Sequence, residues 1–147
     1  MKTIYILLFT TLALLVSSCE KKPIDENIEG MWKMTQFTTL ADGVVHKECP
    51  RIFFSIQLNV VELAEKQCTH EYGTFIGHFY YNEDHSAVTM QDFKFRKSTG
   101  DNGESVPVEK LLPYGINALK TTFKVLKADG KHLVLQSDYA TLEFTNF

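Results

Sequence analysis

The segment of residues 52–63 constrains the fold of this chain more than any other, because its apolar residues recur at every second position. A repeat of two indicates a half-buried β-strand, since successive side chains along a strand point to opposite faces. We therefore predict one continuous strand here, with the recurring apolar side chains inward and the intervening ones outward. The predicted inward side chains are those of Phe54, Ile56, Leu58 and Val60, and the predicted outward ones are those of Ser55, Gln57 and Asn59.

Six further segments have the alternation or the aromatic and β-branched content of strands. They are residues 31–40, 73–81, 87–95, 121–127, 132–136 and 141–147. Turn signals separate several of them, and the strongest hairpin signal is the pair Asp129-Gly130. The composition of residues 98–104 predicts an exposed loop.

No long amphipathic helix is predicted after the N-terminal segment. Only residues 108–119 resist a strand interpretation, and residues 109–112 could begin a short helix. Pro113 and Gly115 would stop that helix within about one turn. Seven or eight antiparallel strands in one small domain predict a closed barrel or a sandwich.

The N-terminal segment has the features of an export signal. Lys2 is followed by an uncharged, largely apolar run over residues 4–16. That run is shorter than the roughly 20 residues of a membrane-spanning helix, so we interpret residues 1–18 as a signal peptide. Residues 19–27 follow as a polar tether, which we expect to be a solvated linker rather than a lipid-binding patch, because Lys21 and Lys22 are only two charges.

The end of this signal, Leu15-Val16-Ser17-Ser18-Cys19, resembles the lipobox of bacterial lipoproteins. The resemblance implies that Cys19 becomes the lipidated N-terminus and anchors the protein in the outer membrane of the cell envelope, where several acyl chains make attachment effectively permanent. An ordinary signal peptidase site, which would release a secreted protein with an unmodified Cys19, is the alternative. The formal net charge of −3 provides no basic surface for nucleic acid, and we expect no such partner.

The predicted folded part opens with Gly30-Met31-Trp32. This Gly-x-Trp at the head of the first strand resembles the signature of lipocalins, and the order of elements is similar to the lipocalin-like domains of small Bacteroides-type lipoproteins. The resemblance covers residues 28–147. It implies an all-β fold, a single antiparallel up-and-down β-barrel of about eight strands, in which Gly30 and Trp32 plug one end.

Two cysteines remain after Cys19, and their state is left open. Cys49 and Cys68 could form a disulfide in an exported protein, or stay as two thiols. A continuous strand over residues 52–63 would hold them roughly 40 Å apart, which argues against the bond. With His46 and His70 they also form a weak zinc-type ligand set, to which the same distance objection applies, so we expect no metal site.

No catalytic motif or phosphate-binding loop occurs, and we expect neither an enzyme nor a bound cofactor. The number of large apolar residues favours a filled barrel that acts as a structural or protein-interaction module. The alternative is a small hydrophobic ligand in the barrel lumen, for which Gly73 and Gly77 would free volume. The possible lumen contacts are Phe54, Ile56, Leu58, His78 and Phe123. A histidine in such a strand more often faces solvent or is hydrogen-bonded in place, so for His78 we favour that alternative.

Overall fold

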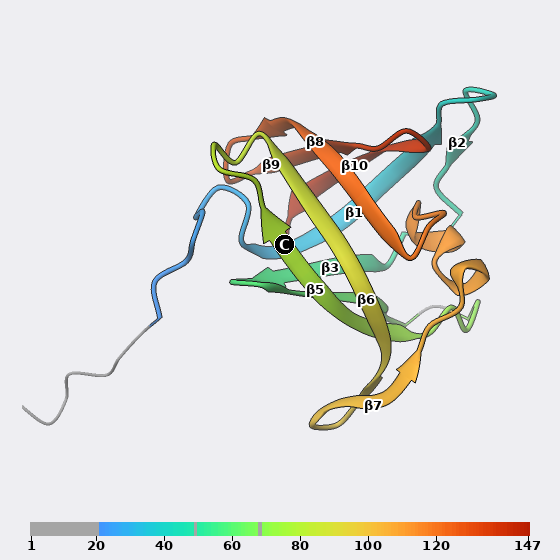
Figure 1. Cartoon of the computed structure of the whole chain (residues 1–147). Coiled ribbons are helices and arrows are strands. Elements are labelled where there is room, and N and C mark those ends of the chain that lie inside the picture. The colour runs from blue at the N-terminus through green and yellow to red at the C-terminus, as the bar shows by residue number, and fades with distance from the viewer. Residues whose placement is uncertain (1–20, 49, 68) are drawn as a thin grey trace, which may run out of the picture.

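In the computed structural model, which describes residues 21–48, 50–67 and 69–147, eight antiparallel strands close into a barrel (Figure 1). Each strand pairs with the next one in the ring, and the last pairs with the first. The ring consists of β1 (Gly30–Thr39), β3 (Ile52–Gln57), β4 (Val60–Glu65), β5 (Thr74–Tyr81), β6 (Ala87–Lys97), β8 (Lys120–Ala128), β9 (His132–Gln136) and β10 (Ala140–Asn146). The prediction of an all-β up-and-down barrel of about eight strands is confirmed.

Two short strands lie outside the ring. Strand β2 (Val45–His46) pairs with the far end of β1, and β7 (Gly100–Ser105) pairs with the end of β6. The β6–β7 arm projects from the barrel in Figure 1, and it contains the residues that we predicted as an exposed loop. Two 3-10 turns, Val108–Lys110 and Leu112–Tyr114, replace the predicted short helix. The second ends at Gly115, whose φ of 74° lies in the left-handed region that favours glycine.

The prediction of one strand over residues 52–63 is wrong. A tight turn at Leu58 and Asn59 divides it into β3 and β4, and Gln57 pairs with Val60 across the turn. Paired residues of an antiparallel hairpin share a face, so Val60 takes the outward face of Gln57 and is 40% exposed. Residues 61 and 63 occupy the inward face instead, and both are fully buried. The predicted orientations of Phe54 and Ile56 are correct.

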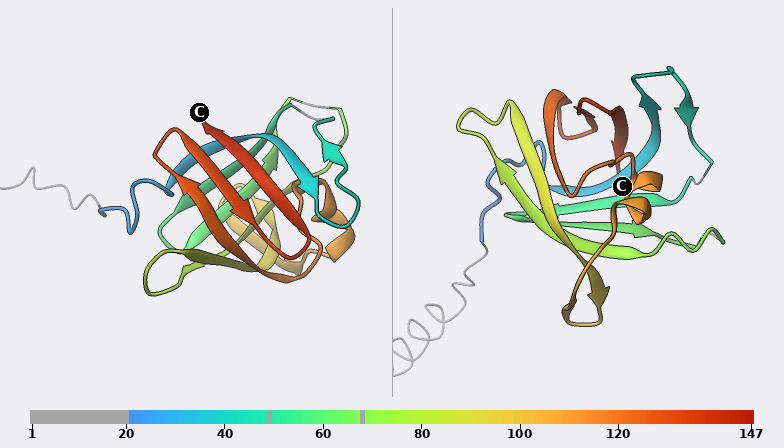
Figure 2. Two further views of the ribbon diagram at one scale, coloured as in Figure 1. Left: turned by 90° about the horizontal axis from the view of Figure 1, so that it is seen from above. Right: turned by 45° about the vertical axis from the view of Figure 1, so that its right-hand side comes forward.

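The barrel has two different ends, which we call the closed end and the mouth. The closed end is where β1 begins and β10 ends. Residues 21–29, which we call the N-terminal segment from here on, enter the barrel there (Figure 2). The mouth lies at the opposite end, beside β2 and the two 3-10 turns. No helix among the described residues is long and apolar enough to cross a membrane.

The last residues of the predicted tether are folded against the closed end. The carbonyl oxygen of Asp25 accepts hydrogen bonds from the backbone N–H groups of Ile28 (3.1 Å) and Glu29 (2.8 Å). The Asp25 carboxylate also lies 2.9 Å from Nδ1 of His85, in the turn between β5 and β6. These contacts tie the segment to the barrel. The folded part therefore begins several residues before residue 28, where we predicted its start.

Candidate functional site

The barrel interior is filled by side chains from every strand of the ring and from the connection between β7 and β8. Tyr114 of that connection is fully buried, with its ring 5.7 Å from that of Phe75 and 6.3 Å from that of Phe54. Its hydroxyl donates a hydrogen bond to the carbonyl oxygen of Gly73. A Cβ on Gly115 would lie 3.1 Å from side-chain atoms of Phe37, so the connection packs closely across the interior.

The two glycines that we expected to free lumen volume do not leave it empty. A Cβ on Gly77 would lie 2.7 Å from the ring of Phe93, and a Cβ on Gly73 would lie 2.9 Å from the ring of Phe75. Real Cβ atoms do not approach other atoms this closely, so the aromatic rings already occupy the space that the glycines leave. Neither glycine therefore supports a ligand in the lumen.

The residues predicted as lumen contacts divide into two groups. Phe54, Ile56 and Phe123 lie in the buried core. The lumen position is wrong for Leu58, and for His78 the alternative, a side chain that faces solvent, is the correct one. Leu58 is half-buried in the β3–β4 turn, and His78 is exposed on the outer wall, where its Nδ1 lies 3.2 Å from the Asp92 carboxylate.

Trp32 is fully buried near the start of β1, as predicted for a residue that seals one end. Gly30 has a φ of 139°, which is open to glycine and rarely to other residues, at the point where the N-terminal segment turns into β1. The remaining predicted positions, Cys19, Cys49 and Cys68, lie outside the described residues.

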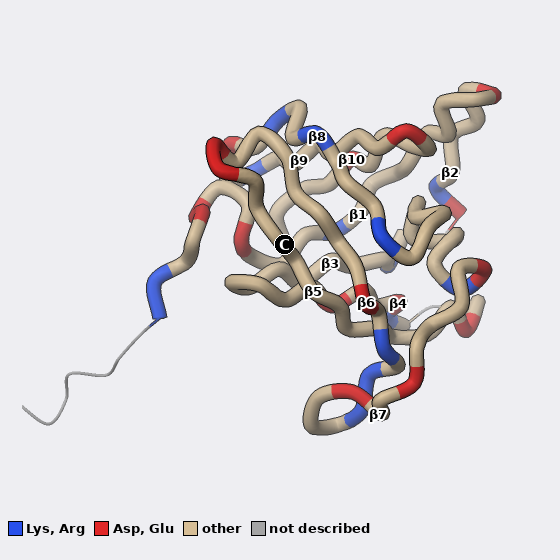
Figure 3. Tube along the Cα trace, viewed as in Figure 1, with Lys and Arg blue, Asp and Glu red and all other residues tan. Residues whose placement is uncertain are grey.

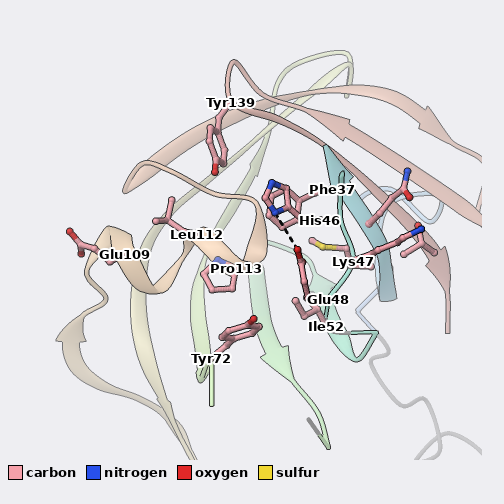
Figure 4. Close-up of a pocket in the computed structure, with 13 residues that line it drawn as sticks. Phe37, His46, Lys47, Glu48, Ile52, Tyr72, Glu109, Leu112, Pro113 and Tyr139 are labelled. Carbon is pink, nitrogen blue, oxygen red and sulfur yellow. Dashed lines mark ion pairs between the residues drawn. The ribbon is translucent and has the colours of Figure 1, made fainter. Parts of the chain in front are cut away.

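A cleft of about 460 Å³ opens at the mouth, where the barrel wall separates. Strand β1 pairs with β3 only over residues 30–33, and beyond them it pairs with β2. The resulting gap is lined by apolar and aromatic side chains with polar groups among them (Figure 4). The principal apolar contributors are Met34, Phe37, Ile52, Tyr72, Leu112, Pro113 and Tyr139.

One wall of the cleft is set by β1 and β2. The imidazole of His46 stacks on the ring of Phe37, with 4.5 Å between centroids and 10° between planes, and its Nδ1 lies 3.7 Å from Glu48 (Figure 4). A hydrogen bond from the Thr39 hydroxyl, together with one from the Val44 amide, lowers the pKa of Asp42 below its ordinary value. The ionised Asp42 thus holds the loop that carries β2 against β1.

The opposite wall is held by a carboxylate. The Glu65 side chain is only 4% exposed and accepts hydrogen bonds from the backbone N–H groups of Tyr72 (2.8 Å) and His70 (3.2 Å). The carboxylate also lies 3.0 Å from Nδ1 of His70, and the His70 ring stacks on Tyr72 at 4.9 Å. These contacts fix the ring of Tyr72 at the cleft.

The arrangement suits binding. Aromatic faces provide contact area at low entropic cost, and the polar groups of Gln36, Lys47 and Glu109 at the cleft can fix the orientation of what enters. Within residues 21–48, 50–67 and 69–147, His, Cys, Asp and Glu side chains form no group of three that could hold a metal ion.

Sequence reasoning did not find this cleft. The gap between β1 and β3 depends on where pairing stops, and no local pattern encodes that. The one available signal was the segment of residues 108–119, which resisted a strand interpretation and brings Leu112 and Pro113 to the cleft.

Comparison with known proteins supports the architecture. A model of the lipocalin-like domain matches residues 13–147. A crystal structure of a lipocalin-like protein from Bacteroides uniformis is 22% identical, with a TM-score of 0.61, and the match covers 82% of this chain and 99% of that one. An uncharacterized protein from Bacteroides eggerthii is 16% identical, with a TM-score of 0.57, covering 81% and 98%. No curated protein matches the chain.

Proposed function

Since the chain belongs to the family of lipocalin-like domains, we propose that it is a lipid-anchored protein of the cell envelope whose barrel is a non-catalytic interaction module. The observation that carries this proposal is the filled interior, in which Tyr114 and its neighbours occupy the space that a lumen ligand would need. Recognition then takes place at the mouth cleft, where aromatic and apolar side chains are accessible.

The anchor rests on the lipobox-like residues that end at Cys19. Replacing Cys19 with Ala should move the protein from the outer-membrane fraction to a soluble fraction. Metabolic labelling with a radioactive or alkyne-bearing palmitate should mark the parent protein and leave Cys19→Ala unmarked. A Cys19→Ala protein that still fractionates with membranes would contradict the anchor.

The interaction role is tested at the cleft by site-specific photo-crosslinking in intact cells. A benzophenone amino acid at Leu112, which lines the cleft and is 39% exposed, should yield one defined protein adduct. The same probe at Leu126, 54% exposed on β8, is the control and should not yield it. Tyr72→Ala should weaken the Leu112 adduct. The same adduct from both positions, or none from Leu112, would overturn the role of the cleft.

A second candidate function is the binding of a small hydrophobic ligand at the cleft. It is favoured by the cleft volume, which lies within the range of small-molecule sites. Native mass spectrometry of the purified protein should then show a bound species of fixed mass, and Tyr72→Ala should release it. A single apo mass would count against this candidate.

A further inference from the structure

The outer wall near the closed end has an apolar hollow that the mouth cleft does not include. It has a volume of about 790 Å³ and lies on the β3–β4 hairpin and the neighbouring part of β5. Its apolar side chains include Leu58, Val60 and Ile76, each half-buried or exposed. Most of the polar lining consists of Ser55, Gln57, Glu62 and Glu29.

The tip of this hairpin holds Leu58 in an unusual conformation. Its φ is 54°, in the left-handed region that is uncommon for a bulky side chain. The carbonyl oxygen of Asn59 accepts a hydrogen bond from the N–H of Phe79 at 2.9 Å, which ties the tip to β5. The turn therefore presents an apolar side chain in a place where glycine or asparagine would be less strained.

One of the two carboxylates that line the hollow is paired with a cation. The Glu62 carboxylate accepts a hydrogen bond from Nε of Arg96 at 2.8 Å. Glu29 accepts one from the backbone N–H of Ile24 at 2.7 Å, so its carboxylate is directed at the N-terminal segment. The basic start of that segment, coloured blue in Figure 3, lies on the same side of the barrel.

The N-terminal segment connects this hollow to the anchor. Lys21 lines the hollow, and Cys19 is two residues earlier in the chain. Two residues of extended chain span at most about 7 Å. In Figures 1 and 2 the tip of the β3–β4 hairpin lies on the side of the barrel from which the N-terminal segment emerges.

We propose that the hollow around Leu58, Val60 and Ile76 rests on the lipid surface, with the β3–β4 tip in the headgroup region. This inference rests on the lipid anchor proposed above. Apolar side chains enter the interface, and Lys21 places its ammonium among the lipid phosphates while its methylene chain covers apolar surface. Contact at this wall directs the mouth cleft away from the lipid, toward a partner.

The test uses an added tryptophan as a depth probe in the full-length, lipidated protein. Val60→Trp places the probe at the hollow, and Val45→Trp is the matched control, a strand valine of similar exposure (45% against 40%) at the mouth. Each protein is isolated from membranes and reconstituted in phosphatidylcholine vesicles with or without brominated acyl chains. The parent protein, whose Trp32 is buried, supplies the baseline.

We expect brominated lipid to quench most of the fluorescence added at Val60→Trp and to leave that at Val45→Trp unchanged. Equal quenching at both positions, stronger quenching at Val45→Trp, or none at Val60→Trp in vesicle-bound protein would overturn the inference and leave the anchor standing. If the protein does not float with vesicles, and Cys19→Ala behaves identically, the anchor itself is wrong and this inference is overturned with it.

Discussion

The indole Nε1 of Trp32 donates a hydrogen bond of 2.6 Å to the backbone carbonyl oxygen of Ile28, four residues earlier in the chain. Trp32 is 0% exposed and Ile28 is 1% exposed. The bond thus satisfies two buried polar groups at once and attaches the N-terminal segment to the closed end. Trp32 is both a core aromatic and the residue that fixes how the chain enters the barrel.

This relationship predicts separate effects for two substitutions. Trp32→Ala should lower the free energy of unfolding by about 3–5 kcal/mol, because it empties a buried site. Trp32→Phe keeps most of the ring but leaves the Ile28 carbonyl without its donor, at a cost of about 1–3 kcal/mol. Urea denaturation followed by circular dichroism measures both. A Trp32→Ala protein as stable as the parent would contradict the assigned role.

The contact between Gly77 and Phe93 predicts a coupled pair. Gly77→Ala should destabilise the protein by about 1–3 kcal/mol, because the new methyl group would meet the Phe93 ring. Phe93→Leu removes most of that obstruction, so the double variant should be more stable than the sum of the single effects predicts, by roughly 0.5–3 kcal/mol. Additive effects in a double-mutant cycle would show that the Phe93 ring does not depend on the missing side chain at Gly77 for its space.

The turn between β8 and β9 predicts sensitivity to acid. The backbone N–H groups of His132 (2.6 Å) and Lys131 (2.9 Å) donate to Asp129 and lower the pKa of its carboxyl group. A lowered pKa in the folded state means that the stabilisation is fully present above the ordinary value of 3.8 and is lost as the pH falls below it. Asp129→Ala should therefore reduce the midpoint of thermal unfolding at pH 7, and the difference from the parent should shrink toward pH 2.

The matched control for that measurement is Asp138→Ala. Asp138 is exposed in the turn between β9 and β10, and its side chain makes no hydrogen bond within the described part of the chain. Its replacement should change the midpoint little at either pH. A difference between Asp129→Ala and the parent that is as large at pH 2 as at pH 7 would contradict the assignment to the ionised carboxylate.

The β3–β4 hairpin also changes the prediction for Cys49 and Cys68. The N–H of Lys66 donates to the carbonyl oxygen of Arg51 at 2.9 Å, and each cysteine is two residues from one member of this pair. The 40 Å objection to a bond therefore no longer applies, and we predict a Cys49–Cys68 disulfide in the exported protein. A bond that closes a loop of this size contributes roughly 3 kcal/mol in the chain-entropy model. Alkylation before and after reduction, read by mass spectrometry, tests it: both thiols alkylated without reduction would refute the bond.

Much of the barrel could be predicted from local sequence. Strands β5, β6, β8, β9 and β10 lie within one to two residues of the predicted ranges, and the hairpin at Asp129-Gly130 forms where its residues indicate. Alternation, β-branched content and turn residues act within a few positions of the chain, so they are readable without the fold. The burial of Trp32 belongs to this group as well.

The tertiary structure alone decided which way several side chains face and where the site lies. The turn at Leu58 and Asn59 has weak local signals, yet it reverses the predicted face of residues 60–63. The cleft exists because β1 leaves β3 after Lys33. Short-range chemistry in the sequence determines whether a segment forms a strand. Pairing between residues far apart in the chain determines which face of the closed sheet each side chain takes and where two neighbouring strands separate.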